Sequence, residues 1–271
     1  MLHTVRAKKS LGQHFLNDKN IAQRIVDSLS GNTEKVLEVG PGMGVLTELL
    51  LQRNDITTYA AEIDRESIAY LQTKFPALGE RLISGDFLQM DLAKLFSENF
   101  SVIGNFPYNI SSQIFFKILD YRDKVPEAVG MVQKEVAERI ACAPGSKTYG
   151  ILSVLLQAFY NIEYLFTVHE HVFSPPPKVK SAVIRLTRNN VQQLDCDEKL
   201  FKQIVKATFN QRRKVIRNSI KAVTGDLVLA ENYLLLKRPE QLSVAEFVTL
   251  TQFISPLLPP PDLNAKPHKQ E

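Results

Sequence analysis

Blocks of apolar residues, separated by polar ones, run through the first 190 residues of the chain. Five blocks have the length and composition of short β-strands: KVLEVG (35–40), TTYAAEID (57–64), RLISGDF (81–87), FSVIGN (100–105) and EAVGMVQ (127–133). Helical patterns such as VLTELLLQR and RESIAYLQTKF lie between the first four. This alternation predicts an α/β fold, a mostly parallel, doubly wound sheet with helices on both faces.

The pattern changes toward the C-terminus. Helices are expected over 134–142 and 149–160, followed by closing strands in EYLFTVHEHVF and SAVIRL that the rigid SPPPKVK joins. After about residue 188, apolar positions recur with helical spacing, and one opposite stripe carries Lys202, Lys206, Arg213 and Arg217. We therefore predict an α/β domain over 1–187, a helical domain over 188–255 and a mobile, Pro-rich tail over 256–271.

The composition is that of an ordinary globular protein, with 44% hydrophobic and 23% charged residues in 271. Cys142 and Cys196 stand far apart without metal-binding spacing, which favours a reducing compartment and no structural metal. The N-terminus lacks the apolar core of a secretory signal, and no apolar run has the length of a bilayer span. We expect a cytoplasmic, monomeric protein without a membrane partner.

Basic residues are concentrated in two segments that contain no acidic residue. The net charge of +4 is mild, but residues 201–221 carry seven cations, and the first seventeen residues add Arg6, Lys8 and Lys9. The candidate RNA-binding residues of the first segment are Lys202, Lys206, Arg212, Arg213, Lys214 and Arg217. Such a face can follow the phosphates of a nucleic acid. The alternative is a basic helix that only faces solvent.

A glycine-rich turn follows the first predicted strand. Its glycines, Gly40, Gly42 and Gly44, have the spacing G-x-G-x-G and not that of the dinucleotide fingerprint. Glu62 and Asp86 end the next two strands, at the edge where open α/β sheets bind ligands. Glu62 is placed to accept hydrogen bonds from ribose hydroxyls, and Asp86 to accept one from an adenine amino group. If no ligand binds, both are surface acids beside turns.

The chain lacks a P-loop lysine and an arginine placed for a ribose 2′-phosphate. An adenosine without a phosphate chain fits better, and S-adenosylmethionine also suits the acids through its positive charge. NAD is the alternative ligand.

The tetrapeptide Asn105-Phe106-Pro107-Tyr108 follows the fourth strand. An adenine amino nitrogen is a poor nucleophile, so an enzyme that alkylates it must orient it and accept its hydrogens. The Asn105 side-chain oxygen and the Phe106 carbonyl can do so, since Pro107 biases Phe106 toward an extended conformation. Tyr108 can stack on the flipped base. Phe173 is a candidate for the second stacking face, and its alternative role is that of a core aromatic.

Six segments, in order over roughly residues 8–221, resemble the bacterial small-subunit ribosomal RNA adenine dimethyltransferases: KKSLGQHFL, VLEVGPGMG, NFPYNIS, QKEVAERI, FSPPPKVKSAV and FNQRRKVIRNSI. The resemblance implies a Rossmann-like class I methyltransferase fold. It also implies that S-adenosylmethionine supplies methyl groups for N6 of two adjacent adenines. These lie in the 3′-terminal hairpin loop of 16S rRNA, within pre-30S particles late in assembly.

The resemblance also carries over to single residues. His14 and Leu16 would close over the cofactor above Gly40, Glu62 and Asp86, and Asn105 would lie near its methyl group. Phe106 replaces a more usual Leu, and we expect it to narrow the pocket entrance. Relatives that confer macrolide resistance act on large-subunit rRNA, but FNQRRKVIRNSI is similar to the small-subunit branch.

Other readings of the chain stay open. A glutamine or DNA-adenine methyltransferase could use a similar clamp, and a non-catalytic assembly factor could keep the same fold. His169 and His171 form an H-x-H pair, which without a third ligand is expected to be solvated. Charge pairs are expected within the helix that starts at Lys134. Ser111 and Ser112 are expected to cap the helix after the clamp.

Overall fold

The computed structural model describes residues 5–259, and these divide into two compact units. The first comprises the chain up to Ala143 together with Thr148–Gln192, and the second Pro144–Lys147 together with the chain from Gln193 on. The proposed mobile tail lies mostly beyond residue 259, outside the described residues.

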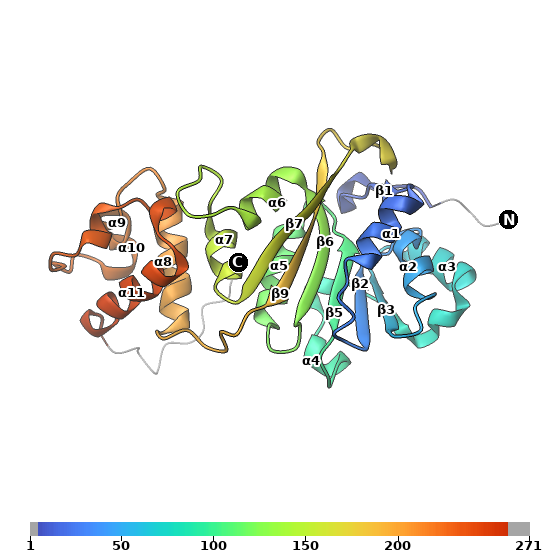
Figure 1. The fold of residues 1–271 in the computed structure, drawn as a ribbon, viewed down its shortest axis with the longest axis horizontal. Helices are drawn as coiled ribbons and strands as arrows, with labels where there is room; N and C mark the ends of the chain where they lie inside the picture. Colours follow the sequence, from blue (N-terminus) through green and yellow to red (C-terminus); the bar gives the residue numbers. More distant parts are fainter. Residues whose placement is uncertain (1–4, 260–271) are drawn as a thin grey trace. The chain divides into compact units, whose positions relative to one another are not determined.

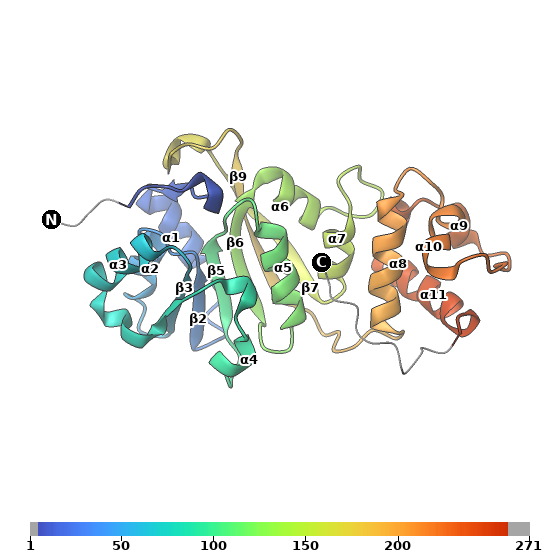
Figure 2. The same cartoon turned by 180° about the vertical axis from the view of Figure 1, so that it is seen from behind.

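A seven-stranded sheet forms the first unit, in the order β4-β3-β2-β5-β6-β9-β7 (Figures 1 and 2). Its strands are β2 (Lys35–Val39), β3 (Thr57–Glu62), β4 (Leu82–Ser84), β5 (Ser101–Asn105), β6 (Glu127–Gln133), β7 (Tyr160–Val168) and β9 (Ser181–Arg188). All neighbours from β4 to β6 pair in parallel, and β9 pairs antiparallel with both β6 and β7. The sheet is therefore mostly parallel, as the alternation of strand and helix patterns predicted.

Helices connect the strands and cover both faces of the sheet (Figures 1 and 2). The α-helices of the first unit are α1 (Lys19–Asp27), α2 (Val45–Leu50), α3 (Arg65–Lys74), α4 (Leu92–Leu95), α5 (Ser111–Asp120), α6 (Lys134–Ala141) and α7 (Ile151–Gln157). Shorter 3₁₀ turns are η1 (Lys9–Leu11), η2 (Pro76–Arg81), η3 (Phe87–Gln89) and η4 (Glu170–Val172). Within α6 the expected charge pairs are confirmed, as Lys134–Glu138 and Arg139–Glu135.

One hydrophobic core joins α1 and α2 to the sheet. The side-chain carboxylate of Asp18 accepts from the backbone N–H groups of Asn20 and Ile21 and so starts α1. The buried face of α1 then packs with Leu46 and Leu50 of α2 against Val36 and other sheet residues. This core holds the first strand and the turn that follows it in a fixed position.

The order of the strands places the site. The chain runs from β2 outward through β3 to β4 and then returns to β5 beside β2. The glycine turn after β2 and the NFPY segment after β5 therefore emerge side by side at the carboxyl edge of the sheet. This is the switch point at which open α/β sheets bind their ligands.

A small two-stranded sheet joins distant segments at this edge. β1 (Phe15–Leu16) pairs antiparallel with β8 (Phe173–Ser174), Phe15 opposite Ser174 and Leu16 opposite Phe173. The N-terminal segment is thereby fixed beside the SPPPKVK loop.

The second unit is helical. Its helices are α8 (Glu198–Asn210), α9 (Ile216–Ser219), α10 (Lys221–Thr224) and α11 (Val244–Ile254), with the 3₁₀ turns η5 (Tyr233–Leu236), η6 (Pro239–Gln241) and η7 (Ser255–Leu257). Because α8 ends at Asn210, the prediction of one stripe that continues from Lys206 to Arg217 is wrong. Residues 211–215 turn the chain before α9 begins. Within residues 5–259, no helix combines the length and hydropathy that a bilayer span requires.

Candidate active site

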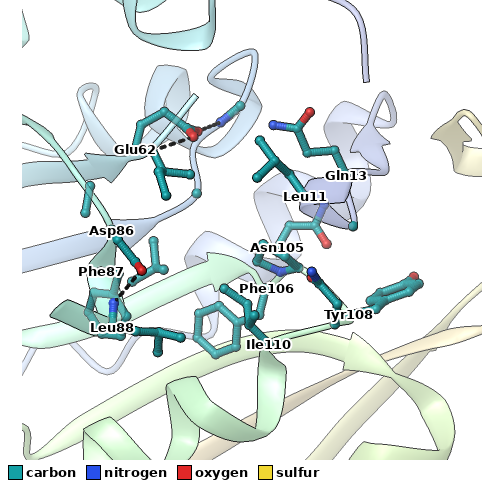
Figure 3. Close-up of a pocket in the computed structure, with 18 of the residues that line it drawn as sticks. Leu11, Gln13, Glu62, Asp86, Phe87, Leu88, Asn105, Phe106, Tyr108 and Ile110 are labelled. Atoms are coloured by element: carbon teal, nitrogen blue, oxygen red, sulfur yellow. Dashed lines mark hydrogen bonds between the residues drawn. The ribbon is translucent and has the colours of Figure 1, made fainter. Parts of the chain in front are cut away.

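A single pocket at the carboxyl edge of the sheet collects most of the candidate residues (Figure 3). Glu62 and Asp86 lie on one side of it, and Asn105 and Tyr108 on the other. Its wall consists of residues 11–15, 39, 40, 42, 61–63, 85–88 and 105–110. The ends of β2, β3, β4 and β5 and the N-terminal segment therefore build one site.

The glycine turn and Glu62 form the floor of the pocket. Gly40 and Gly42 have positive φ angles of 69° and 56°, which few residues other than glycine adopt. The Gly42 N–H donates to Glu62 Oε2 (3.1 Å), while the N–H groups of Ile63 and Asp64 donate to Oε1 (2.9 and 2.8 Å). Oε1 thus uses both lone pairs, and Oε2 is the freer acceptor for a ribose hydroxyl.

Asp86 caps the 3₁₀ turn η3. Its Oδ1 accepts from the Leu88 N–H at 2.9 Å, which leaves Oδ2 as the freer acceptor. The apolar residues Phe87, Leu88 and Ile110 line the pocket around it. Ile63 also lines the pocket although half of its surface is exposed, an unusual position for isoleucine. An acceptor beside apolar side chains suits a flat, polar-edged ring such as adenine.

Acidic side chains line the pocket and a smaller recess beside it. Glu38 is 1% exposed and lines a smaller recess that shares Phe15, Gly40 and Asn105 with the pocket. Burial, with a smaller contribution from the nearby Glu62 carboxylate, raises the pKa of Glu38 to about 8 against the opposing effect of the hydrogen bond that Thr47 donates. Burial also raises the pKa of Glu62. Among the described residues that line either cavity, none is Lys or Arg, so a positively charged ligand fits.

Asn105 is held in one orientation by the N-terminal segment. Its side-chain Nδ2 donates to the His14 carbonyl oxygen at 2.8 Å. The amide group is planar, so this bond turns Oδ1 away from the His14 carbonyl and leaves it free to accept. The acceptor role predicted for Asn105 requires an amide oxygen that is oriented in this way.

Phe106 lies in a slot between two glycines. Its N–H donates to the Met131 carbonyl (3.0 Å), and its fully buried ring meets Phe115 edge-on. A Cβ atom added at Gly130 would lie 2.5 Å from the ring, and one at Gly104 2.9 Å. The expectation that Phe106 narrows the entrance is wrong, because its side chain points into this slot. No donor within residues 5–259 bonds its carbonyl oxygen, which reaches a substrate only if the segment opens locally.

For the methyl transfer that the sequence resemblance implies, we expect Gly130→Ala to reduce the rate about a hundredfold without changing cofactor affinity, because the Phe106 ring would shift and displace the clamp. Combining it with Phe106→Leu removes the clashing ring atoms and should restore most of the rate. Steady-state kinetics and cofactor titration of both variants test this. A double variant that is as slow as the single one would show that the slot does not position the clamp.

Tyr108 is fixed by polar and aromatic contacts. Its hydroxyl bonds the Ser181 hydroxyl, and burial raises its pKa. The His14 ring lies 5.2 Å from the Tyr108 ring at 31°, and His14 Nδ1 donates to the Pro175 carbonyl (2.8 Å). One face of Tyr108 is therefore already occupied by His14, a contact that the sequence did not indicate.

Two predicted residues do not reach the pocket. Phe173 is 3% exposed and packs with Leu16 in the core beneath α1 and α2. Phe173 therefore has no free face for a base, and its role as second stacking surface is wrong. Leu16 lines only the smaller recess, whereas Leu11, Gln13 and Phe15 line the pocket itself. The one sequence feature that pointed to Leu11, Gln13 and Phe15 is the basic, glycine-containing segment KKSLGQHFL in which they lie.

The start of α5 also differs from the expectation. The N-cap is Ile110, without a side-chain cap, so the capping role of Ser111 and Ser112 is wrong. Instead, Ser111 Oγ donates to the Tyr108 carbonyl at 3.3 Å and ties the helix to the clamp. His169 and His171 are exposed, with ring centres 5.8 Å apart, and no cluster of three or more metal-ligating side chains occurs within residues 5–259.

The basic residues of the second unit fall into two groups. Lys206, Arg213, Lys214 and Arg217 are exposed, and Lys202 is half-buried. Arg212 instead donates to the Ser146 carbonyl (3.1 Å) and lies 3.8 Å from the Glu240 carboxylate. Because these contacts hold the loop at Pro144–Lys147, Arg212 is a structural residue and not a free cation.

Comparisons with known proteins show what the chain is similar to. Residues 4–255 match the family model described as ribosomal RNA adenine dimethylase. The chain is 59% identical to ribosomal RNA small subunit methyltransferase A of Cytophaga hutchinsonii, over 94% of this chain and 99% of that protein. It is 60% identical to the protein of that name from Bacteroides thetaiotaomicron, over 94% and 96%.

Solved structures show the same fold. A dimethyladenosine transferase from Plasmodium falciparum superposes with a TM-score of 0.75 at 23% identity, covering 90% of this chain and 98% of that one. The 23S rRNA methyltransferase ErmE gives 0.62 at 25% identity, covering 88% and 99%. At these coverages, each match extends into the second unit.

Proposed function

The chain belongs to the ribosomal RNA adenine dimethylase family, and we propose from this that it dimethylates N6 of two adjacent adenines in the 3′-terminal hairpin loop of 16S rRNA. The single observation that carries the site assignment is the orientation of Asn105, whose Nδ2 is committed to the His14 carbonyl. Its Oδ1 is thereby left as an acceptor in the pocket that also contains Glu62 and Asp86.

The residues present fit S-adenosylmethionine. Glu62 Oε2 would accept from a ribose hydroxyl, Asp86 Oδ2 from the adenine amino group, and the glycine turn leaves room for backbone approach. The carboxyl groups of Glu38 in the smaller recess and of Glu62 and Asp86 in the pocket suit its cationic centre and amino group. When bound, this cofactor supplies an electrophilic methyl group on a sulfonium.

Asn105 provides the main contribution of the chain to the reaction. Its Oδ1 would accept a hydrogen bond from the target amine. This bond orients the nitrogen and increases its electron density. Because the bond to His14 fixes the amide before substrate arrives, little entropy is lost on reaction. The Phe106 carbonyl would accept a hydrogen bond from the second amino hydrogen, which requires that the NFPY segment opens locally and exposes this carbonyl. The product cation can then lose a proton to water.

Tyr108, which is half-buried and lines the pocket, would stack on the target base with the ring face that His14 does not contact. Base flipping costs a few kcal/mol, and stacking on one aromatic face returns about 1–3 kcal/mol. His14 packs against the other face of the ring and fixes its position. A second aromatic residue on the far side of the base is therefore not required. The unstacked bases of an RNA loop lower the cost further.

The exposed cations of the second unit would contact phosphates. We expect the double variant Arg213→Gln/Lys214→Gln to weaken rRNA binding about tenfold and to lower the salt slope by about two, since each phosphate contact contributes close to one. Lys199→Gln is the matched control, because Lys199 is exposed at the other end of α8 beside acidic residues. Binding titrations at several salt concentrations measure the affinity and the salt slope. If the control lost as much affinity as the double variant, Arg213 and Lys214 would not form a phosphate-binding face.

The substrate form and cellular setting follow from the proposed reaction. We propose that the chain acts as a monomer on pre-30S particles in the cytoplasm, where these subunits assemble. The alternative is an assembly factor that binds the particle without catalysis on the same fold.

Methyl transfer to isolated particles tests the proposal. Radiolabelled S-adenosylmethionine is incubated with the protein and with 30S particles that lack the modification. Label should enter 16S rRNA and not ribosomal protein. Large subunits serve as the control, and label entering 23S rRNA instead would point to the macrolide-resistance branch of the family.

A further inference from the structure

The N-terminal segment covers the pocket as a strap, here defined as residues 8–16. Five of its residues, 11–15, line the pocket, and Leu11 and Gln13 lie across it from Glu62 and Asp86 (Figure 3). The strap is compact, because the Lys8 N–H donates to Gln13 Oε1 (2.8 Å) and the Leu11 N–H to the Lys8 carbonyl (3.0 Å). A cofactor in this pocket therefore has the strap as one wall.

The clamp side of the strap is anchored by several bonds. The His14 carbonyl accepts from Asn105, and the His14 ring donates to the Pro175 carbonyl. The Ser10 carbonyl accepts weakly from Asn109 at 3.4 Å, and Phe15 pairs with Ser174 in the small sheet. This end remains attached even if one contact is lost.

Within residues 5–259, the polar contacts between the strap and the ribose side of the pocket come from Lys8. Its ammonium bonds the Asp64 carboxylate and lies 3.1 Å from Glu66. The Asp64 side chain is 2% exposed, and that of Lys8 is 34% exposed. Burial alone would raise the pKa of Asp64, but hydrogen bonds from Lys8 and Ser67 hold it below its ordinary value. Lys8 is thus the cation that a buried carboxylate requires.

Asp64 connects this pair to the predicted ribose ligand. Its backbone N–H donates to Glu62 Oε1 at 2.8 Å, and its side chain starts α3. We propose that Lys8 is a positioning residue, a latch that closes the strap over the cofactor and aligns the Glu62 loop beneath it. The inference rests on the proposed function only in the identity of the ligand.

Neighbouring lysines offer a matched test. Lys8→Gln removes the latch, Lys9→Gln removes the same charge from an exposed position, and Lys8→Arg keeps the ion pair. We expect Lys8→Gln to raise the Kd for S-adenosylhomocysteine about three- to tenfold in calorimetry without RNA. Hydrogen exchange of residues 8–16 in the free protein should also accelerate, while the other two variants resemble the wild type.

The possible outcomes test the role of Lys8 separately from the proposed function of the protein. Unchanged Kd and exchange in Lys8→Gln, or an equal change in Lys9→Gln, would overturn the latch. A general loss of stability would instead accelerate exchange in the core strands as well, which also contradicts a local role. If the wild type failed to bind S-adenosylhomocysteine, the proposed function would fail, and exchange would still decide the latch.

Discussion

Asn105→Ala should abolish methylation, with a turnover at least about a thousandfold lower, while the affinity for S-adenosylmethionine changes little. The substitution removes the acceptor that orients the target amine. It also removes one bond to the strap, but the anchors at Lys8 and Pro175 remain. Single-turnover methyl transfer and a separate cofactor titration measure the two effects.

Asn54→Ala is the control for this experiment. Asn54 is an exposed amide of the first unit that lines neither the pocket nor the smaller recess. Its loss should leave the rate within about threefold of the wild type. Unchanged turnover in Asn105→Ala would contradict the clamp and move catalysis elsewhere in the pocket.

Asp86→Asn should weaken cofactor binding about ten- to a hundredfold. The asparagine oxygen can still accept from the Leu88 N–H and cap η3, so the turn should persist. The position of Oδ2, however, becomes an N–H donor that faces the donor group of the adenine. Equilibrium titration with S-adenosylmethionine measures the loss.

Asp91→Asn provides the comparison, because Asp91 caps α4 through the Ala93 N–H in the same way but does not line the pocket. It should bind cofactor like the wild type. If the two variants bound the cofactor equally well, Asp86 would not accept a hydrogen bond from the adenine. The assignment of an adenosine to this site would then lose its main argument.

The sequence predicted those parts of the site that depend on local chain order. Glu62 and Asn105 end strands of a parallel sheet, Asp86 follows the end of β4 at Ser84, and the carboxyl ends of such strands meet at one edge. Their convergence therefore followed from recognising the strands. The glycine turn was predictable for the same reason, since its spacing and position after β2 are both local features.

The errors have a different origin. Phe173 and Leu16 face each other across β1 and β8, a pairing of segments far apart in the chain that no periodicity reveals. Arg212 looks like its neighbour Arg213 in sequence, but α8 ends two residues earlier and turns it toward Glu240. The Phe106 slot depends on Gly130 of a neighbouring strand. In all three cases, tertiary contacts between distant segments determine where the side chain points, and the sequence pattern does not show these contacts.

The most direct measurement is nucleoside analysis of 16S rRNA after reaction of unmodified 30S particles with the protein and S-adenosylmethionine. We expect N6,N6-dimethyladenosine, confined to the 3′-terminal hairpin loop and absent when Asn105→Ala replaces the wild type. Tight particle binding without any methylated adenosine would contradict this account and place the protein among the assembly factors.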